Sequence, residues 1–245
     1  MRALVAAGRL LRLVPHVLHG LWIVRRRFEL LSGTERHQMI QWWSLKTLRI
    51  LGIRLQVQGS ALPDGHLLVA NHISWLDIAA VHGVLPQARF VSKADVKHWP
   101  LVGALVEGAG TLFIERSSKR DALRVVHQTA AALEAGDCVA VFPEGTTGAG
   151  PELLPFHANL LQAAVSTGAP VLPVVLRWHE PGERFSTSAR FIGDMTLAQS
   201  LWRIATARGL GIDVQVLPSV QPEGQDRRAL GETLRGAISE ALARG

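Results

Sequence analysis

The sequence lacks several features that define common protein classes. It has one cysteine, Cys138, set in an apolar run, so an intramolecular disulfide framework and a cysteine-rich metal site are excluded. Although 48% of the residues are hydrophobic, no stretch approaches the roughly 18 uncharged apolar residues of a membrane-spanning helix. A Gly-x-Ser-x-Gly nucleophile motif is also missing. With 245 residues, the chain is nevertheless long enough for one well-packed domain.

Negative charge is scarce near the N-terminus. Residues 1–54 hold ten Arg and Lys against two acids, a net charge of +8, whereas the whole chain carries +6 and the remainder therefore −2. A basic segment can bind nucleic acid or anionic lipid. Here the arginines alternate with Leu, Val, Ile and Trp, which favours lipid headgroups. We therefore expect an anionic membrane surface as a partner, and no nucleic acid.

Two segments of this basic region are amphipathic. Leu10–Val24 is mostly apolar but interrupted, and Arg25–Arg27 follows it where a signal peptide would have a small-residue cleavage site. Glu35–Leu51 places two adjacent tryptophans among basic residues, a composition suited to a bilayer interface. We expect residues 1–54 to form a two-helix membrane anchor, peripheral or monotopic, at the cytoplasmic face of a bacterial inner membrane. The alternative is a pair of helices packed on the domain core.

From about residue 55, short β-rich runs alternate with helical stretches. Several of the runs are continuously apolar, as strands buried on both faces of a mainly parallel sheet are. Helices are expected at Asp121–Gly136 and Asp226–Ala243. The pattern predicts one three-layer α/β domain over residues 55–245, with a mainly parallel mixed sheet flanked by helices. The expected strands are Arg54–Gln58, His66–Ala70, Ala88–Ser92, Gly110–Ile114, Cys138–Phe142, Val171–Leu176, Ala189–Ile192 and Ile212–Leu217.

A histidine and an aspartate follow the expected strand His66–Ala70. His72 and Asp77 are five positions apart, which on a regular helix would turn them about 140° away from each other. They can meet if His72 lies in the turn before a helix and Asp77 in its first turn. Ser74 supports this geometry as an N-cap residue, with Asp77 as the acid three positions later. A carboxylate on one ring nitrogen would fix the tautomer and leave the other nitrogen as a base.

The same pair has a purely structural interpretation, in which Asp77 completes a capping box and His72 is an ordinary turn residue. If the pair is catalytic, no side-chain nucleophile accompanies it, because Cys138 is expected to be buried within a strand. The sequence then predicts direct attack by a substrate hydroxyl rather than a covalent enzyme intermediate.

Three further segments carry polar or proline residues, two of them at the ends of expected strands and one within a strand. Gly110–Arg116 delivers Arg116, whose guanidinium could hold a phosphate, although a solvated basic loop is the alternative. Phe142–Thr147 could bring Glu144 and backbone amides to a ligand, although a plain turn is the alternative. Pro173 lies inside an expected strand, where it marks an edge, a bulge or a bend toward a site.

Together these segments resemble the glycerolipid acyltransferase family, which includes the bacterial 1-acylglycerol-3-phosphate acyltransferases. The resemblance spans about residues 65–180, and its four blocks together are far more specific than any one of them. The blocks are Asn-His-x4-Asp, Gly-x-x-Phe-Ile-x-Arg, Phe-Pro-Glu-Gly-Thr and a proline-bearing strand, matched by Asn71–Asp77, Gly110–Arg116, Phe142–Thr146 and Pro173. Ser92–Asp95 is similar to the family's segment between the first two blocks.

The resemblance implies roles for individual residues. His72 would act as general base on the acceptor hydroxyl, and Asp77 would position it. The residues implied in substrate binding are Arg116, Glu144, Gly145, Thr146 and Lys93, and the amides near Gly145 and Thr146 are candidate oxyanion donors. The co-substrate would be an acyl thioester of coenzyme A or acyl carrier protein, with no metal and no permanently bound cofactor.

Two departures from the family pattern bear on the acceptor. The third block commonly continues with Arg, where this chain has Thr147, and Phe156–Asn159 replaces a common Phe-Lys-x-Gly pattern. The expected acceptor is 1-acyl-sn-glycerol-3-phosphate, giving phosphatidic acid. The alternative is lyso-ornithine lipid or another lysolipid, because the Thr-Thr form is similar to a proteobacterial side branch. Two other classes stay open: a thioester hydrolase, and a membrane-binding protein without catalysis.

Overall fold

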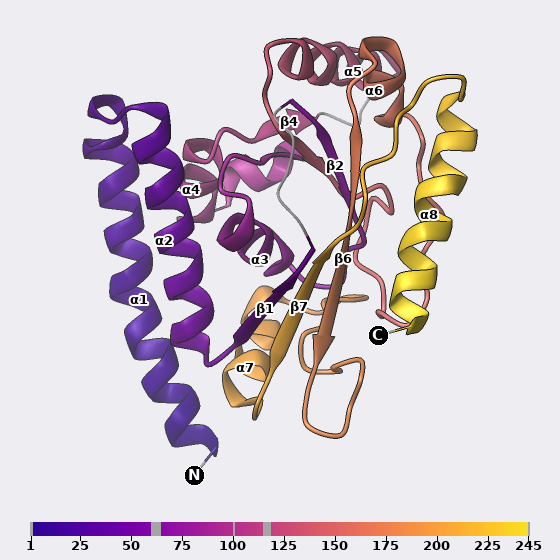
Figure 1. Ribbon diagram of the computed structural model, residues 1–245. Helices are drawn as coiled ribbons and strands as arrows, with labels where there is room; N and C mark the ends of the chain where they lie inside the picture. Colours follow the sequence, from indigo (N-terminus) through magenta and orange to yellow (C-terminus); the bar gives the residue numbers. More distant parts are fainter. Residues whose placement is uncertain (1, 60–64, 100, 115–118, 245) are drawn as a thin grey trace.

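The computed structural model describes residues 2–59, 65–99, 101–114 and 119–244. A seven-stranded sheet with helices on both faces forms its centre (Figure 1). The strand order is β1-β7-β6-β2-β5-β3-β4, and all neighbours are parallel except β6 and β7, which confirms a mainly parallel mixed sheet. The strands are β1 (Arg54–Gln58), β2 (Leu67–Ala70), β3 (Arg89–Lys93), β4 (Leu112–Ile114), β5 (Val139–Val141), β6 (Val171–His179) and β7 (Gly211–Val216).

The helices cover the sheet in two layers, each with its own buried cluster. One cluster includes side chains of α1, α2, α3 and α7, and the other includes side chains of α5, α6 and α8. Along β6, Leu172, Val174 and Leu176 join the first cluster, whereas Val171 and Val175 join the second. This alternation follows from the two-residue period of a strand. The helices are α1 (Arg2–Arg26), α2 (Gly33–Leu51), α3 (Asp77–Val84), α4 (Val102–Gly108), α5 (Lys119–Glu134), α6 (Leu161–Thr167), α7 (Leu197–Thr206) and α8 (Arg227–Arg244); 3-10 turns span Phe28–Leu30 and Ala94–His98.

The first two helices form an antiparallel hairpin beside the sheet (Figure 1). Ser32 and Glu35 make a reciprocal capping box that begins α2, and Gly52 ends it with a φ of 74°. Leu48 and Leu51 are buried in the same cluster as the strands, so the hairpin packs on the core. Among the described residues, no helix combines the length and apolar character needed to cross a membrane.

The outer side of α1 differs from its inner side. Leu4, Leu11 and Leu18 are 77%, 74% and 52% exposed, whereas Leu13 is buried in the core. The helices thus pack on the core, as the alternative interpretation has it, and α1 also presents an apolar row to the outside, while the membrane anchor stays a prediction.

One expected strand is absent. Ala189–Ile192 is irregular chain, and its Phe191 N–H donates to the carbonyl of Ile73 in the loop after β2. The prediction was wrong because a short, mostly apolar segment can satisfy its backbone with single loop contacts as well as with a ladder. Most other strand limits shift by one or two residues, β6 runs three residues further than expected, and α5 and α8 lie where helices were expected.

Pro173 lies in β6, a strand with neighbours on both sides. It pairs with Val69 of β2, while pairing of β6 with β7 begins one residue later at Val174 and Val216. Val171 bridges Val220 beyond the end of β7. Three residue steps along β6, from Val174 to Val171, therefore face four steps along the opposing segment, from Val216 to Val220. The proline thus sits beside a bulge, one of the interpretations offered for it, and not at an edge.

Candidate active site

Four parallel strands, β2, β5, β3 and β4, end at the same edge of the sheet, and the motif segments follow them. Ligand sites of open α/β sheets collect at such carboxyl ends. Asn71 extends β2 past its end: its side-chain amide donates to the carbonyl of Leu176 at 2.9 Å and accepts from the amide of Leu176 at 2.8 Å. This pairing anchors the next residue, His72, at the end of the strand.

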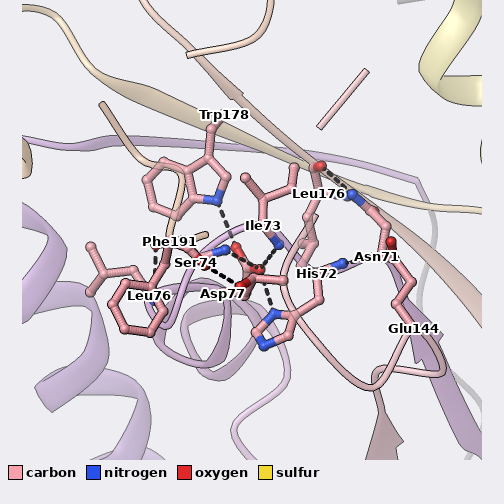
Figure 2. Close-up of polar contacts among 11 residues, drawn as sticks. Asn71, His72, Ile73, Ser74, Leu76, Asp77, Glu144, Leu176, Trp178 and Phe191 are labelled. Atoms are coloured by element: carbon pink, nitrogen blue, oxygen red, sulfur yellow. Dashed lines mark hydrogen bonds and ion pairs between the residues drawn. The ribbon is translucent and has the colours of Figure 1, made fainter. Parts of the chain in front are cut away.

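The structure brings His72 and Asp77 together. His72 Nδ1 lies 2.8 Å from Oδ2 of Asp77, with His72 in the loop and Asp77 at the first position of α3 (Figure 2). Ser74 is not the N-cap residue that the sequence predicted, because α3 begins at Asp77 with Leu76 as its N-cap. The hydroxyl of Ser74 accepts from the backbone N–H of Leu76 and not from that of Asp77. Asp77 nevertheless accepts from the backbone of Ser74 at 2.9 Å, so the acid half of the capping arrangement is present.

Asp77 is fully buried and surrounded by donors (Figure 2). Its Oδ2 accepts from the amides of Ile73 and Ser74 at 2.7 and 2.9 Å, in addition to His72. Its Oδ1 accepts from the indole Nε1 of Trp178 at 2.6 Å. Because three N–H groups hold the carboxylate in place, it presents Oδ2 to the imidazole as an acceptor. Nδ1 then carries a proton, and Nε2 presents a lone pair.

The imidazole of His72 lies flat on the ring of Phe142, with centroids 4.0 Å apart and planes 7° apart. Phe142 in turn stacks on Phe90 at 5.4 Å. The side chain of His72 is 18% exposed, and among the described residues its Nε2 has no hydrogen-bond partner. The ring is therefore fixed from two directions, by Asp77 and Phe142, while one nitrogen stays accessible.

Trp178 was not found from the sequence. It lies on β6, 101 positions from the aspartate it contacts, and is 1% exposed. A tryptophan continuing an apolar strand predicts only core packing, and nothing in its spacing links it to Asp77. The contact follows from strand order, because β6 lies next to β2.

Glu144 binds the chain itself. Its Oε1 accepts from the backbone N–H of His72 at 2.7 Å, and its Oε2 accepts from that of Leu154 at 2.9 Å. Burial is the main cause that raises the pKa of Glu144, which is 4% exposed, and the two backbone N–H groups oppose that rise. In this structure both oxygens are engaged, so the expected contact with a substrate stays a prediction. The geometry instead links the loop after β5 to the loop after β2.

The loop after β5 makes further contacts within the fold. The amide of Gly145 donates to the carbonyl of Phe142 at 3.1 Å, and the φ of Gly145 is 70°. The turn thus uses the amide of Gly145. The other expected oxyanion donor is the amide of Thr146, a residue that is exposed. The hydroxyl of Thr147 donates to the carbonyl of Phe191. Gly148 donates to the carbonyl of His72 at 2.7 Å, a second tie between the loops.

The remaining residues expected in substrate binding lie on neighbouring strands. Lys93 is the exposed last residue of β3, at the same sheet edge as His72. Among the described residues, no carboxylate forms an ion pair with Lys93. Arg116 lies outside the described residues; the strand before it, β4, ends at Ile114 beside Lys93. His157 is exposed, and its backbone N–H donates to the carbonyl of Pro143.

Cys138 is remote from nucleophilic chemistry. It is 4% exposed, and burial raises the pKa of its thiol to about 12, with Asp137 adding to the rise. A thiol with such a pKa is not a nucleophile near neutral pH. The arrangement at the sheet edge can therefore accept a proton at Nε2 of His72 and stabilise the resulting imidazolium through Asp77.

Comparisons with known proteins agree with the geometry. The sequence profile of the Acyltransferase family matches residues 54–177. A lyso-ornithine lipid O-acyltransferase of Pseudomonas aeruginosa is 36% identical over 248 residues, covering 99% of this chain and 94% of that protein. A 1-acyl-sn-glycerol-3-phosphate acyltransferase of Neisseria gonorrhoeae is 40% identical over 183 residues, covering 74% of this chain and 71% of that protein.

A solved structure has the same fold. The crystal structure of the 1-acyl-sn-glycerophosphate acyltransferase of Thermotoga maritima matches with a TM-score of 0.75 and covers 99% of this chain and 97% of that one. Its sequence is 20% identical, so the likeness concerns the architecture alone.

Proposed function

This chain belongs to the acyltransferase family and is an acyltransferase of the lysolipid type, and we propose that His72 acts in it as the general base. The acyl group comes from a thioester of coenzyme A or acyl carrier protein. It goes to the free hydroxyl of a lysolipid acceptor. The observation that carries the proposal is the orientation of His72, with Nδ1 bound to a buried carboxylate and Nε2 accessible.

The reaction is a direct transfer without an enzyme intermediate. Nε2 of His72 takes the proton of the acceptor hydroxyl while the oxygen attacks the thioester carbonyl carbon. The tetrahedral adduct then loses the carrier thiolate, and the imidazolium returns the proton to the sulfur. A new C–O bond thus replaces the C–S bond, and the base is regenerated. General-base assistance of this kind contributes on the order of 10²–10⁴ in rate.

The loop contacts support a positioning role for Glu144. By accepting the N–H of His72 and of Leu154, it fixes the loop that carries the base relative to the loop after β5. Lys93, Thr146 and Arg116 are proposed to contact substrate from the ends of β3, β5 and β4. The strands β5, β3 and β4 are neighbours in the sheet, in that order.

Two observations favour lyso-ornithine lipid as the acceptor. The P. aeruginosa relative named for that substrate covers 99% of this chain, whereas the N. gonorrhoeae relative covers 74%. Thr147 occupies the position of a family arginine and turns its hydroxyl inward to Phe191, so this position supplies no cation for a phosphate. 1-Acyl-sn-glycerol-3-phosphate, the acceptor predicted first from the sequence, stays the second candidate because the N. gonorrhoeae relative is 40% identical.

The hairpin of α1 and α2 is proposed to dock the enzyme on the membrane that holds its acceptor. Residues 1–54 carry a net charge of +8, and the outer row of α1 exposes Leu4, Leu11 and Leu18. Apolar side chains flanked by cations suit an anionic bilayer interface. We propose the cytoplasmic face of a bacterial inner membrane, with the hairpin lying in one leaflet.

An acceptor panel tests the proposal. The full chain is assayed with lyso-ornithine lipid, 1-acyl-sn-glycerol-3-phosphate and lysophosphatidylglycerol, each with acyl-coenzyme A and acyl carrier protein donors. We expect the highest kcat/KM with lyso-ornithine lipid. Faster transfer to the glycerol phosphate would reverse the order of the two acceptors. Thioester cleavage at the same rate without any acceptor would instead assign a hydrolase.

The role of His72 is tested with a matched variant. His72→Ala should abolish transfer while keeping the circular dichroism spectrum, whereas His127→Ala, an exposed histidine on α5, should keep wild-type turnover. Full turnover in His72→Ala would rule out the assignment of the base.

A further inference from the structure

A cavity of about 440 Å³ lies between α1 and α2, away from the residues assigned to acyl transfer. Three permanently charged side chains line it, Arg12 from α1 and Lys46 and Arg49 from α2. Two histidines of α1, His16 and His19, complete its polar wall. No residue of the cavity belongs to the motifs at the sheet edge.

No described residue balances the positive charge of this cavity by an ion pair. Among the described residues, no carboxylate forms an ion pair with Arg12, Lys46 or Arg49. The two acids of residues 1–54 are Glu29 and Glu35, and Glu35 is bound to Ser32 at the start of α2. Three like charges around one cavity repel each other and attract an anion.

His16 adds an independent sign of a missing ligand. It is 4% exposed, and its Nε2 lies 3.1 Å both from the carbonyl of Trp43, which can only accept a hydrogen bond, and from the hydroxyl of Thr47, which donates its own proton to that carbonyl. Nε2 therefore carries the proton, and Nδ1 presents a lone pair that is buried without a partner among the described residues. Burial chiefly lowers the pKa of His16; the hydrogen bond to the Trp43 carbonyl opposes this change, and Lys46 and His19 add to it.

A buried acceptor without a partner costs free energy unless a ligand satisfies it. The ligand that fits this cavity must bring an anion for the three cations and a donor for Nδ1 of His16. A phosphodiester next to a hydroxyl group has both features. An inorganic anion offers the charge without the neighbouring alcohol.

The place of the cavity on α1 points to a lipid as the source. Leu11, Val14 and Leu18 are 74%, 59% and 52% exposed and form the outer apolar row. Arg12 and His19 each follow one residue after a member of that row, which places them roughly 100° further around the helix. With the apolar row in the acyl region of a bilayer, the cavity would lie beside it at the depth of the headgroups.

We propose that the cavity between α1 and α2 binds the headgroup of one anionic phospholipid, with the phosphodiester against Arg12, Lys46 and Arg49 and a headgroup hydroxyl donating to Nδ1 of His16. Phosphatidylglycerol has this chemistry. The inference rests on the proposed function in that it needs contact with a membrane, but it concerns a site separate from His72. The bound lipid orients the hairpin and is not consumed.

The test uses short-chain lipids that stay monomeric, so that headgroup binding is separated from bilayer insertion. Calorimetric titration of the full chain with dihexanoyl phosphatidylglycerol should show one site. Removing two cations in Arg12→Gln/Arg49→Gln should weaken binding about 25-fold, at about fivefold per cation. The control Arg25→Gln/Arg26→Gln removes the same charge at the exposed end of α1 and should change the Kd by less than about twofold.

Two further probes separate the contacts. Dihexanoyl phosphatidylmethanol has the same charge but no headgroup hydroxyl, and should bind about threefold or more weakly because Nδ1 of His16 then stays without a donor. Glycerol 3-phosphate and inorganic phosphate test whether a free phosphate is the ligand. Equal losses in the two double variants, or equal affinity for inorganic phosphate and phosphatidylglycerol, would overturn the proposal.

The outcome is distinguishable from a failure of the proposed function. His72→Ala should keep the phosphatidylglycerol affinity while losing acyl transfer. Arg12→Gln/Arg49→Gln should keep kcat for soluble short-chain substrates. A wild-type chain that binds phosphatidylglycerol but transfers no acyl group would refute only the enzymatic assignment.

Discussion

Replacing Trp178 with phenylalanine removes one hydrogen-bond donor and keeps an aromatic ring in the core. The indole Nε1 donates to Oδ1 of Asp77 at 2.6 Å, and both side chains are essentially inaccessible. Among the described residues it is the sole partner of that oxygen. The variant leaves a buried carboxylate oxygen unpaired, which should lower the free energy of unfolding by about 2–3 kcal/mol.

The effect on catalysis follows from how Asp77 is held. Its Oδ2 keeps the amides of Ile73 and Ser74, so the carboxylate is loosened but not released. Complete loss of such a carboxylate's orienting function lowers kcat by about 10⁴ in a related His–Asp arrangement. Partial loosening in Trp178→Phe should therefore lower kcat on the order of tenfold, while KM for the acceptor changes less than about twofold.

Trp75→Phe is the matched control. Its indole Nε1 donates to the hydroxyl of Ser200 at 3.1 Å, so the same N–H is removed on the same side of the sheet without touching Asp77. Both variants are assayed at saturating thioester below their unfolding temperatures, and their stabilities are measured by chemical denaturation. Turnover in Trp178→Phe equal to that in Trp75→Phe would show that the Trp178 N–H stabilises the fold without orienting the pair.

Three further changes test separate parts of the structure. Glu144→Gln places an amide NH₂ against one of two backbone donors, the N–H of His72 or that of Leu154. The variant should lower the free energy of unfolding by about 2 kcal/mol and kcat at least severalfold. Unchanged values in both assays would contradict the positioning role. Burial lowers the pKa of His82 from 6.5 to about 4, so the unfolded chain binds a proton first, and stability should fall by about 3 kcal/mol as pH drops from 6.5 to 4. Denaturation at several pH values should show that His82→Gln lacks this loss, and an identical pH dependence would argue against it. Cys138→Ala should keep wild-type turnover, and loss of activity on treating the native enzyme with a thiol reagent would contradict its burial.

The parts of the fold that could be predicted are those with a local signal. Strands buried on both faces, such as β2 and β6, are continuous apolar runs, and α5 ends near a glycine. Ala189–Ile192 is mostly apolar as well, and Ala189 is buried, but Ile192 is 40% exposed and the segment bonds to a loop and not to a strand. A short apolar segment therefore does not reveal which backbone it will pair with.

The candidate site shows the same division. The spacing of His72 and Asp77 predicted their contact, because both lie within one short loop and the start of one helix. The donor from Trp178 and the stacking of Phe142 on the imidazole depend on which strands become neighbours. Glu144 was expected to face a substrate, yet its two acceptors hold backbone amides from loops that only the folded sheet brings together.

The dual character of α1 and α2 decides how a detergent-free form of this enzyme should be made. Deleting the hairpin would uncover the surface now covered by Leu48 and Leu51, which are at most 1% exposed, and the shortened protein should aggregate. Substituting Leu4, Leu11 and Leu18 with glutamine leaves that packing intact, since these side chains face outward. The hairpin is therefore best redesigned on its surface and kept in full.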